Sequence, residues 1–418
     1  MVVTVVGLGF VGLTTALGFS EYGHKVYGIE ANEPRLETIK GGMLPFLEPG
    51  LDEALIRHLG KNFVPTADWK KAVSESDFVY YCVGTPYGEN GEADLTYLYG
   101  AIGQTLAAMD DGKFRVLVTK STIPPGTTQN RIIPFIEGKG FKAGDKFGVA
   151  NNPEFLREGH CWDDFINADR IVLGVSDEKS AGMLRTLYGK AGCPVHTVSL
   201  NTGEFIKYLS NTSLALLISF ANEMSMAADA LGGIDVAQAF RILHEDRRWQ
   251  TGGIRAYFYP GCGYGGYCLP KDTNAFYAKA RNAGFDGQIL RNIIAVNDGM
   301  AAVSAGRIEA ACGNDSTKAV GILGLSFNPG SDDVRDTPAA KIIRELNGRG
   351  YRKIVAYDPV ASGEFRKHYD VAAEFAESVD DVVAKADVIA ITTAWDEFKD
   401  IKSRTAKPVV DLRYMLEG

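Results

Sequence analysis

The sequence predicts an α/β protein with two doubly wound domains, joined by a long central helix and a helical middle domain. Near both ends of the chain, short apolar runs rich in β-branched residues alternate with helical stretches, the pattern of a parallel sheet covered by helices. Between them, residues 203–231 contain few turn-forming residues and have the character of one helix. We therefore expect domains at residues 1–198, 199–310 and 311–418.

The first domain begins with a strand, a glycine-rich turn and a helix. Residues 2–6 (VVTVV) form a short β-branched run typical of a buried strand, and helical character follows from Leu13 to Tyr22. The other strands of this domain are expected at 25–30, 78–83, 115–119, 147–150 and 170–175.

The long helix and the last domain show equally regular patterns. Phe205, Leu209, Leu216 and Phe220 recur at roughly helical spacing, so we expect the helix to be a spine and the surface of a homodimer. In the last domain we expect strands at 319–323, 353–357, 387–392 and 408–412, and a helix at 338–347 that begins with proline.

Composition and charge exclude several classes of protein. The net charge of −8 argues against a general nucleic-acid binder, which needs a basic surface to displace counterions from phosphates. No run of about 18 apolar residues is uninterrupted, so no membrane span is expected, and the N-terminus lacks the features of a signal peptide. The six cysteines are scattered without paired spacing, which favours free thiols in a reducing, cytoplasmic setting. No metal site is expected.

The turn after the first strand matches the G-x-G-x-x-G fingerprint of Rossmann-like domains. Its glycines allow a tight turn, close approach of a pyrophosphate and close packing of the helix, whose N-terminus faces the phosphates. Glu30 ends the next strand, where a carboxylate accepts from ribose hydroxyls and repels the 2′-phosphate of NADP. NAD is therefore the expected cofactor, although Arg35 is near enough in sequence to accommodate a 2′-phosphate. The residues expected to bind it here are Gly7, Gly9, Phe10, Val11, Gly12, Glu30 and Arg35.

The last domain, although also Rossmann-like in its alternation of strands and helices, lacks this fingerprint. Residues 321–324 (GILG) do not have the required spacing, so no second dinucleotide is assigned. The ends of its strands, including the loop at 332–335, suit a different nucleotide.

The glycine-rich stretch GYGGYCLPKD at 263–272 contains the strongest candidate nucleophile. Glycines let a backbone approach a ligand closely, and Lys271, three residues after Cys268, favours the thiolate. Asp272 follows at i+4, on the same face if the stretch is helical. The alternative is a small buried cysteine before a helix, and these residues alone favour neither interpretation.

Polar residues also occur on the long helix. Glu204, Lys207 and Asn211 share one of its faces. This face is either functional or a solvated edge of an otherwise apolar helix.

Residues 152–159 (NPEFLREG) are predicted to begin another helix, with Asn152 as its cap and a proline in its first turn. Glu154 and Glu158 would then stand four residues apart. They are either surface charges or, near a hydride-transfer site, groups that bind a water or a substrate hydroxyl.

Together these motifs resemble the UDP-glucose/GDP-mannose dehydrogenase family over essentially the whole chain. Several motifs in the same order are far more specific than any one of them. They are GLGFVG at 7–12, LPFLEPGL at 44–51, GTP at 84–86, KSTIPPGTT at 120–128, NPEFLREG at 152–159, EFIKYLSNTSLALLISFANE at 204–223, GYGGYCLPKD at 263–272 and GLSFNPGSDDVRDTP at 324–338.

The resemblance implies a four-electron oxidation of a sugar C6 alcohol to a carboxylate, with two NAD per sugar. Cys268 would add to the aldehyde and, after a second hydride transfer, would carry a thioester that water hydrolyses. Lys207 would stabilise an oxyanion with the support of Asn211, and Asp272 would assist proton movement and the hydrolytic water. Glu154 would act on the thioester step.

The resemblance also implies which residues contact the ligands. Thr122 would hold a catalytic water. Near the cofactor we expect Thr85, Thr122, Glu158, Lys271 and Arg335. Near the nucleotide sugar we expect Glu154, Phe155, Leu156, Lys207, Asn211, Arg255, Tyr264, Gly265, Gly266 and Cys268.

Three positions depart from the family pattern. Tyr267 stands where many relatives have serine, and Asn328 where a lysine contacts sugar or phosphate. Gly252 aligns with an arginine that reaches the substrate of the neighbouring subunit in many relatives, and either Arg248 or Arg255 could replace it. The LPKD ending of the cysteine motif resembles the glucose and mannose branches, so UDP-glucose is the expected sugar and GDP-mannose the alternative.

Two other classes of function fit part of the sequence. A two-electron dehydrogenase of a hydroxy acid has the same dinucleotide-binding fold but needs neither Cys268 nor the last domain. A non-catalytic nucleotide sensor or scaffold would keep only the fold. Counting NADH per product separates the first from the cysteine route, and replacing Cys268 by alanine separates the second.

Overall fold

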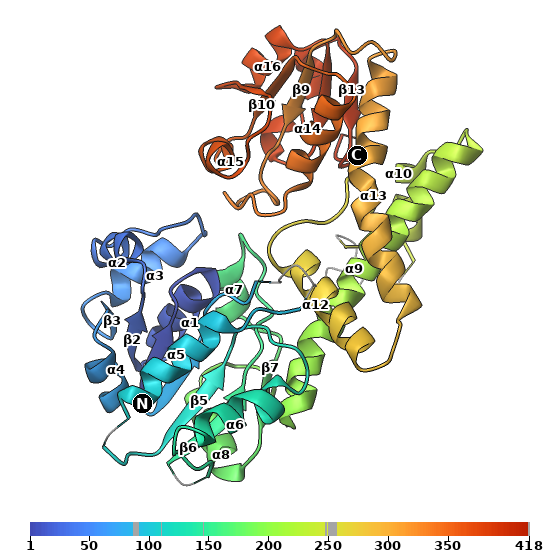
Figure 1. Cartoon of the computed structure of the whole chain (residues 1–418). Coiled ribbons are helices and arrows are strands. Elements are labelled where there is room, and N and C mark those ends of the chain that lie inside the picture. The colour runs from blue at the N-terminus through green and yellow to red at the C-terminus, as the bar shows by residue number, and fades with distance from the viewer. Residues whose placement is uncertain (87–91, 110, 145, 247–248, 250–256, 417–418) are drawn as a thin grey trace. The chain divides into compact units, whose positions relative to one another are not determined.

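The structure is a computed structural model that describes residues 1–418 except 87–91, 110, 145, 247–248, 250–256 and 417–418. The chain divides into two compact units, Met1–Leu209 and Ser210–Gly418 (Figure 1). The division falls inside one long helix, α9 (Leu200–Leu231).

The first unit is built on one sheet surrounded by helices. Its strands are β1 (Val2–Val6), β2 (Lys25–Ile29), β3 (Phe63–Thr66), β4 (Phe78–Tyr81), β5 (Arg115–Thr119), β6 (Phe147–Asn151), β7 (Ile171–Val175) and β8 (Val195–Val198). Its helices are α1 (Phe10–Glu21), α2 (Glu33–Lys40), α3 (Leu51–His58), α4 (Trp69–Glu75), α5 (Thr96–Ala107), the π-helical turn η1 (Thr128–Ile132), α6 (Ile133–Glu137), α7 (Cys161–Ile166) and α8 (Glu178–Leu187).

The strand order in this sheet is β3-β2-β1-β4-β5-β6-β7-β8. The pairs from β3 to β6 are parallel, β7 is antiparallel to β6, and β8 is parallel to β7. Parallel strands present their carboxyl ends at one edge of a sheet, which is where ligands bind in doubly wound folds.

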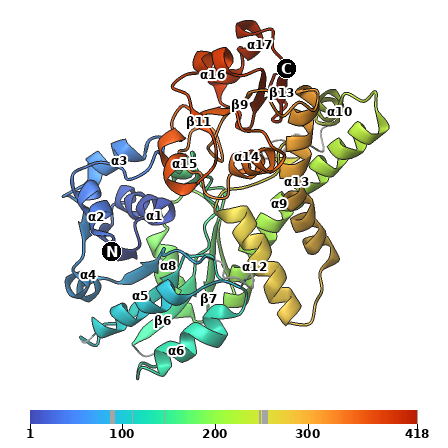
Figure 2. The ribbon, with the colours of Figure 1, turned by 45° about the horizontal axis from the view of Figure 1, so that its top comes forward.

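Both faces of this sheet are covered because successive side chains of a strand point to opposite faces. Val3 and Val5 of β1 belong to a core shared with α1, α3, α7 and α8, whereas Val6 belongs to a core shared with α4, α5 and α6. Figure 2 shows α5 and α6 beside each other along the strands. Burial on both sides explains why β4 and β5 are apolar along most of their length.

The second unit consists of a helical part and a smaller sheet. The helices of the first part are the rest of α9, α10 (Val236–Leu243), α12 (Cys268–Asn282) and α13 (Gln288–Ala311). The strands are β9 (Val320–Leu323), β10 (Ile354–Tyr357), β11 (Glu374–Phe375), β12 (Val388–Ile391) and β13 (Val409–Asp411). They pair in parallel in the order β11-β10-β9-β12-β13. Around them lie α14 (Pro338–Gly348), α15 (Ser362–His368), α16 (Val379–Lys385), the 3₁₀ turn η3 (Asp396–Phe398) and α17 (Ile401–Arg404).

Within the second unit, α13 joins the helical part to the sheet. The later part of α9 packs along α13, where the Ser219 hydroxyl donates to the Ile293 carbonyl and Arg307 pairs with Asp229 at 2.7 Å (Figures 1 and 2). The other side of α13 shares a core with α14 and the strands β9, β10 and β12.

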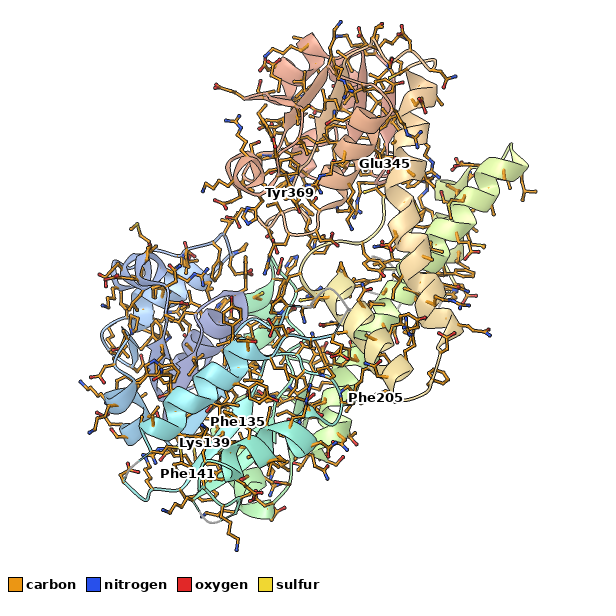
Figure 3. The ribbon with its side chains drawn as sticks, in the orientation of Figure 1. Phe135, Lys139, Phe141, Phe205, Glu345 and Tyr369 are labelled. Carbon is orange, nitrogen blue, oxygen red and sulfur yellow. The ribbon has the colours of Figure 1, made fainter. Side chains whose placement is uncertain are left out.

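The apolar residues predicted to form a stripe on α9 are exposed rather than buried in the core. Phe205, labelled in Figure 3, is 41% exposed, and Leu209, Leu216 and Phe220 are exposed to a similar degree. By length and composition alone α9 is apolar enough to cross a membrane, which is weak evidence because the core helix of a soluble protein passes the same test.

The predicted fold class is confirmed, and the expected strands occur within a residue or two of their predicted ends. Three strands, β3, β8 and β11, were not predicted from the sequence. Each is short, and β3 contains Pro65 while β8 contains His196 and is only partly buried. Strands at the edges of a sheet lack the continuous apolar run that predicts a central strand.

The helix predicted to begin at Asn152 is wrong. Residues 152–157 form an extended loop, and α7 begins only at Cys161. The Asn152 side chain does not cap a helix because it donates to the Val172 carbonyl in the core. The Glu154 carboxylate accepts from the N–H of Leu156, two residues later, which holds a turn instead.

The cap of α7 comes from a distant segment. Both carboxylate oxygens of buried Glu48 accept backbone N–H groups, from Gly159 at 3.0 Å and from Cys161 at 2.7 Å. The LPFLEPGL motif therefore fixes the end of the NPEFLREG loop, because it satisfies donors that a helix N-terminus leaves unpaired.

Candidate active site

The glycine turn between β1 and α1 has the geometry that its fingerprint predicts. Gly7 has a φ of +88°, and its N–H donates to the Ile29 carbonyl at 2.8 Å. A Cβ at Gly12 would lie 1.7 Å from the Gly7 carbonyl oxygen, so only glycine lets α1 start this close to β1. A Cβ at Gly9 would meet no described atom within 4 Å. The space in front of Gly9 is thus open to a pyrophosphate, next to the first turn of α1, which Phe10 begins.

Glu30 follows β2 and is nearly inaccessible. Its carboxylate accepts the N–H groups of Leu8 at 3.0 Å and Asn32 at 2.8 Å, and Arg35 approaches it at 3.5 Å. The acid thus ties the glycine turn to the end of β2. Glu30, expected to accept from the ribose hydroxyls, and Arg35, considered able to accommodate a 2′-phosphate, thus lie together.

The loops after β4 and β5 are joined to each other and to α9. The Thr85 hydroxyl donates to the carbonyl of Thr122 at 2.9 Å. Farther along the same loop, the N–H groups of Gly126 and Thr128 donate to the buried Glu204 carboxylate at 2.6 and 2.8 Å. Glu204 is therefore an anchor for the KSTIPPGTT loop rather than part of a solvated edge.

Glu154 and Lys207 form a buried ion pair in the first unit. Their side chains are 5% and 4% exposed, and Lys207 Nζ lies 2.7 Å from Glu154 Oε1. Burial raises the pKa of Glu154, but the charge and hydrogen bond of Lys207 outweigh burial and leave that pKa below its ordinary value. Glu154 is therefore an ionised carboxylate, suited to accept a proton rather than to donate one.

The aromatic ring of Phe155 lies beside the same pair. The Arg170 guanidinium stacks over this ring at 4.2 Å, and Lys207 Nζ lies 5.6 Å from its centre. The loop that follows β6 thus brings Glu154 and Phe155 to one lysine, while Glu158 is partly buried near its end.

In the second unit Cys268 is the first residue of α12 and is half-buried. The stretch is helical, as the predicted Cys268–Asp272 arrangement requires, so the two side chains share a face. Asp272 is completely buried; one oxygen accepts from Asn211 Nδ2 at 2.6 Å and the other from the Lys271 ammonium.

Lys271 is protonated in this setting. Burial lowers its pKa, but the negative charges of Asp272 and of the Cys268 thiolate outweigh burial, and the net pKa is raised. The same attraction works in the other direction, so a buried cation near Cys268 favours its thiolate form. This supports Cys268 as a nucleophile over the alternative of an inert buried cysteine.

The glycine-rich loop before Cys268 packs closely on its own unit. A Cβ at Gly265 would lie 2.3 Å from the Asp336 carbonyl oxygen. The Asn297 side chain accepts from the Tyr264 N–H at 2.7 Å and donates to the Tyr264 carbonyl at 3.1 Å. These glycines therefore let the cysteine loop dock on the loop before α14, and the predicted contacts of Tyr264 to Gly266 with a nucleotide sugar stay predictions.

Tyr267, one of the departures from the family pattern, lies between two cations. The guanidinium of Arg335 is 4.4 Å and Lys271 Nζ is 5.3 Å from the centre of its ring. Asp333 holds Arg335 through both of its oxygens, the shortest contact being 2.6 Å. Two of the predicted cofactor contacts, Lys271 and Arg335, are thus brought together by an aromatic ring.

Sequence reasoning missed the residues that act through distant partners. Glu48 and Lys120 hold the NPEFLREG loop of the first unit, and Asn297 holds the cysteine loop of the second. Only Glu48 and Lys120 lie inside matched motifs, which was the only signal in the sequence. Outside the described residues lie Gly252 and the two arginines expected to replace the family arginine at that position, Arg248 and Arg255.

Models of one protein family match the chain from end to end. The NAD binding domain of the UDP-glucose/GDP-mannose dehydrogenase family matches residues 1–191, its central domain residues 201–299, and its UDP binding domain residues 321–418. The chain belongs to the UDP-glucose/GDP-mannose dehydrogenase family. The resemblance stated from the motifs is confirmed, and with it NAD as cofactor.

Individual relatives agree with this assignment. The UDP-glucose 6-dehydrogenase AglM of Haloferax volcanii is 36% identical over 95% of this chain and 92% of its own. The GDP-mannose 6-dehydrogenase of Pseudomonas aeruginosa is 33% identical over 99% and 96%. The solved structure of a UDP-glucose dehydrogenase from Pyrobaculum islandicum is 35% identical, covers 100% of this chain and 95% of its own, and superposes with a TM-score of 0.93.

The chain is thus an NAD-dependent nucleotide-sugar dehydrogenase. The family models divide it near the boundaries expected from the sequence, whereas spatial compactness gives two units that share α9. The two descriptions differ because the helical part packs with the second sheet through α13.

Proposed function

We propose that this protein oxidises the C6 alcohol of UDP-glucose to the carboxylate of UDP-glucuronate, with two NAD consumed per sugar. The relatives named UDP-glucose 6-dehydrogenase support the sugar, and the match to a UDP binding domain at residues 321–418 supports the nucleotide. GDP-mannose is the second candidate, because a GDP-mannose 6-dehydrogenase is nearly as similar.

The observation that carries the proposal is Cys268 at the start of α12 with Lys271 and Asp272 beside it. The first oxidation removes a hydride and a proton from the alcohol and yields an aldehyde. The Cys268 thiolate then adds to the aldehyde carbon, and the resulting oxygen takes up a proton to give a thiohemiacetal. Loss of a second hydride and that proton gives a thioester, which water cleaves to the carboxylate and the free thiol.

Asn211, Asp272 and Lys271 prepare the nucleophile. The protonated Lys271 favours the Cys268 thiolate, and the buried Asp272 accepts hydrogen bonds that fix Lys271 and Asn211 in place. We propose that Asp272 also takes part in proton movement during hydrolysis.

Lys207 and Glu154 serve the oxygen atoms of the reacting carbon. We propose that Lys207 stabilises the oxyanion that forms when sulfur or water adds. A buried ammonium attracts such an anion more strongly than an ammonium in water, because the local dielectric constant is lower. Glu154, an ionised carboxylate at 2.7 Å from Lys207, would accept a proton from the hydrolytic water. Thr122, on the loop fixed by Glu204, is proposed to hold that water.

The residues around the glycine turn fit NAD. The open space at Gly9 accommodates a pyrophosphate at the N-terminus of α1, and the Glu30 carboxylate suits a ribose that carries no 2′-phosphate. NAD, when bound, accepts the hydride from the sugar carbon. Gly7, Gly12, Phe10 and Val11 are proposed to shape this part of the site.

The test is cofactor reduction against UDP-glucose, GDP-mannose, UDP-galactose and UDP-N-acetylglucosamine, with the carboxylate product counted. We expect two NADH per carboxylate, and the highest kcat/KM with UDP-glucose. One NADH per product would contradict the thioester route. Cys268→Ala should lose carboxylate formation, whereas Cys193→Ala, a matched change at a partly exposed thiol in the first unit, should keep it.

We further propose a homodimer that covers the exposed apolar face of α9. The exposed side chains of Leu216 and Phe220 support it, since contiguous exposed apolar surface marks an interface. A monomeric mass in sedimentation equilibrium would contradict it. Leu216→Asp should weaken the dimer, and Ile56→Asp, an exposed apolar position on α3, should not. A reducing, cytoplasmic compartment is also proposed, because all six cysteines are free thiols.

A further inference from the structure

Lys120, the first residue after β5, is a buried lysine to which the mechanism assigns no role. It stands at the carboxyl end of its strand, where its N–H and that of Ser121 both donate to the Tyr81 carbonyl. Its side-chain ammonium donates to Asn152 Oδ1 at 3.1 Å, and the Tyr188 hydroxyl donates to the same oxygen at 2.5 Å. The residue as a whole is 5% exposed.

The ammonium of Lys120 has unusually little compensation for a buried charge. None of the carboxylates in the described part of the chain lies within ion-pair distance of it, and it donates to the amide oxygen of Asn152. Burying a cation without a paired anion is costly. Proteins retain such groups chiefly at functional sites, where their charge is used.

The ionisable groups that face Lys120 come from three other segments. Cys82 follows β4, Glu154 follows β6 and Lys207 belongs to α9, and the charges of Glu154 and Lys207 act on Lys120. Cys82 is a neutral thiol because burial raises its pKa to about 12, and burial also holds the pKa of Tyr188 well above its ordinary value. The charges in this cluster are therefore two ammonium groups and the single carboxylate of Glu154.

We propose that Lys120 is a positioning residue for the oxidation: its ammonium gives the buried Glu154–Lys207 pair a net positive surrounding, which stabilises the anionic oxygen formed at the sugar carbon. When Lys207 stabilises that oxygen, its positive charge compensates the Glu154 carboxylate less. Lys120 supplies that compensation and keeps Glu154 ionised. The inference rests on the proposed function, because it assigns Lys120 to the oxyanion steps of that reaction.

The charge of Lys120 should be sensitive to mildly alkaline pH. Burial lowers its pKa to about 8, although the negative charge of Glu154 partly opposes this effect. The ammonium is present below that value and is lost as the pH rises through it. Activity that depends on this charge should therefore fall along an alkaline limb near pH 8.

The stability of the fold should respond in the opposite sense to activity. The folded pKa lies below the ordinary value of 10.5, so at neutral pH the folded chain keeps a proton less readily than the unfolded chain. The charged lysine thus costs stability at pH 7, and this cost disappears as the pH rises to the ordinary pKa. Removing the charge with an apolar side chain of similar length should leave the fold no less stable.

The experiment compares Lys120→Met, Lys120→Arg and the control Lys142→Met, an exposed lysine of the same unit, with the wild type. Lys120→Met should lower kcat at pH 7 by about tenfold, with the KM for NAD changed less than about twofold, and should abolish the alkaline limb. Lys120→Arg, a permanent cation, should restore kcat to within about threefold and move the limb up by at least about one pH unit. Lys142→Met should match the wild type.

Thermal unfolding of the same variants separates a positioning role from a structural one. The midpoint of Lys120→Met should equal or exceed that of the wild type. A lower midpoint or a failure to fold would overturn the proposal, and so would wild-type kcat or an unchanged alkaline limb in Lys120→Met. The assays use whichever nucleotide sugar the wild type oxidises best. One NADH per product in the wild type would contradict the thioester route itself, whereas two NADH with unaltered Lys120→Met kinetics would contradict only the role of Lys120.

Discussion

The two sheets of this chain share one strand order around a central strand, yet they treat the turn after that strand differently. In the first unit Gly7 follows β1 and α1 begins three residues later, at Phe10. In the second unit Gly324 follows β9 in the same way, with its N–H donating to Tyr357 at 2.8 Å, but α14 begins only at Pro338. The same strand order therefore brings a helix N-terminus close to the end of the central strand only where the turn after that strand is short.

The acids at the end of the second strand of each sheet show the same contrast. Glu30 accepts two backbone N–H groups and keeps capacity for a ribose hydroxyl, since a carboxylate has about four acceptor sites. Asp358 follows β10 and is surrounded by donors of its own unit. These are the N–H groups of Leu325, Ser326, Val360 and Ala361, the Ser326 hydroxyl and the Trp395 indole. Asp358 therefore organises a protein loop, whereas Glu30 has acceptor sites left for the hydroxyl of a ligand.

Replacing these acids gives the largest expected effects. Asp358→Ala leaves four backbone N–H groups without their acceptor, and at about 1 kcal/mol each the free energy of unfolding should fall by about 4 kcal/mol. Glu30→Ala should cost roughly half as much, because it removes two such bonds. Urea unfolding of both variants measures the difference. Equal losses of unfolding free energy would contradict the proposed difference between the two acids.

The next effect concerns the close approach of α1 to its turn. Gly12→Val adds a side chain whose Cβ alone would lie 1.7 Å from the Gly7 carbonyl oxygen. Overpacking of about 3 kcal/mol should displace α1 and weaken NAD binding on the order of a hundredfold. Pro329→Ala changes the corresponding, exposed position after β9 and should leave NAD affinity unaltered. Isothermal titration with NAD tests both, and tight binding by Gly12→Val would refute the role of the short turn.

Gly9→Ala should separate binding from folding. Its methyl group meets no described protein atom within 4 Å, so the unfolding midpoint should not change. The same methyl group occupies the space of the pyrophosphate, and a loss of roughly 1.4 kcal/mol would weaken NAD binding about tenfold. A lowered midpoint with unchanged affinity would mean that this glycine serves the fold alone.

The smallest expected effect concerns the contact between Tyr267, just before α12, and Arg335, in the loop between β9 and α14. Tyr267→Ser removes the ring under Arg335. A cation–π contact of about 0.5–1 kcal/mol corresponds to a KM change of roughly threefold. Tyr267→Phe keeps the ring and should behave as the wild type. Steady-state kinetics with varied NAD and varied nucleotide sugar would show whether the change falls on one ligand, and identical constants in both variants would exclude a role for the ring.

The parts of the molecule that the sequence could predict are those specified locally. The β-branched run at residues 2–6 and the glycine spacing at 7–12 each determine their own conformation, and β1 and its turn are where they were expected. The helix predicted from Asn152 fails because its residues bond elsewhere: Asn152 to the Val172 carbonyl, and the donors before α7 to Glu48. A local pattern does not report such partners, of which Val172 lies 20 residues from Asn152 and Glu48 more than 100 residues from its donors.

The candidate site shows the same division. Cys268, Lys207 and Asp272 were predicted as candidates from their types and spacing, and the structure places Asp272 with Asn211 and Lys207 with Glu154. Their pairing was not predicted, because an ion pair between segments depends on packing that a motif does not encode. Lys120 was inside a matched motif, but its proposed role rests on the lack of a paired carboxylate in the described part of the chain, which is visible only when its neighbours are known.

The two hydrogen bonds from the KSTIPPGTT loop to Glu204 also determine when that loop can settle. Gly126 and Thr128 precede Glu204 by 78 and 76 residues. At roughly 5–20 residues per second, a ribosome needs about 4–15 s to add the carboxylate that these amides require. When Thr128 is added, the nascent chain already contains the residues of β1, β4 and β5 but not Glu204, so the loop that carries Thr122 gains its anchor only after the start of α9 has been made.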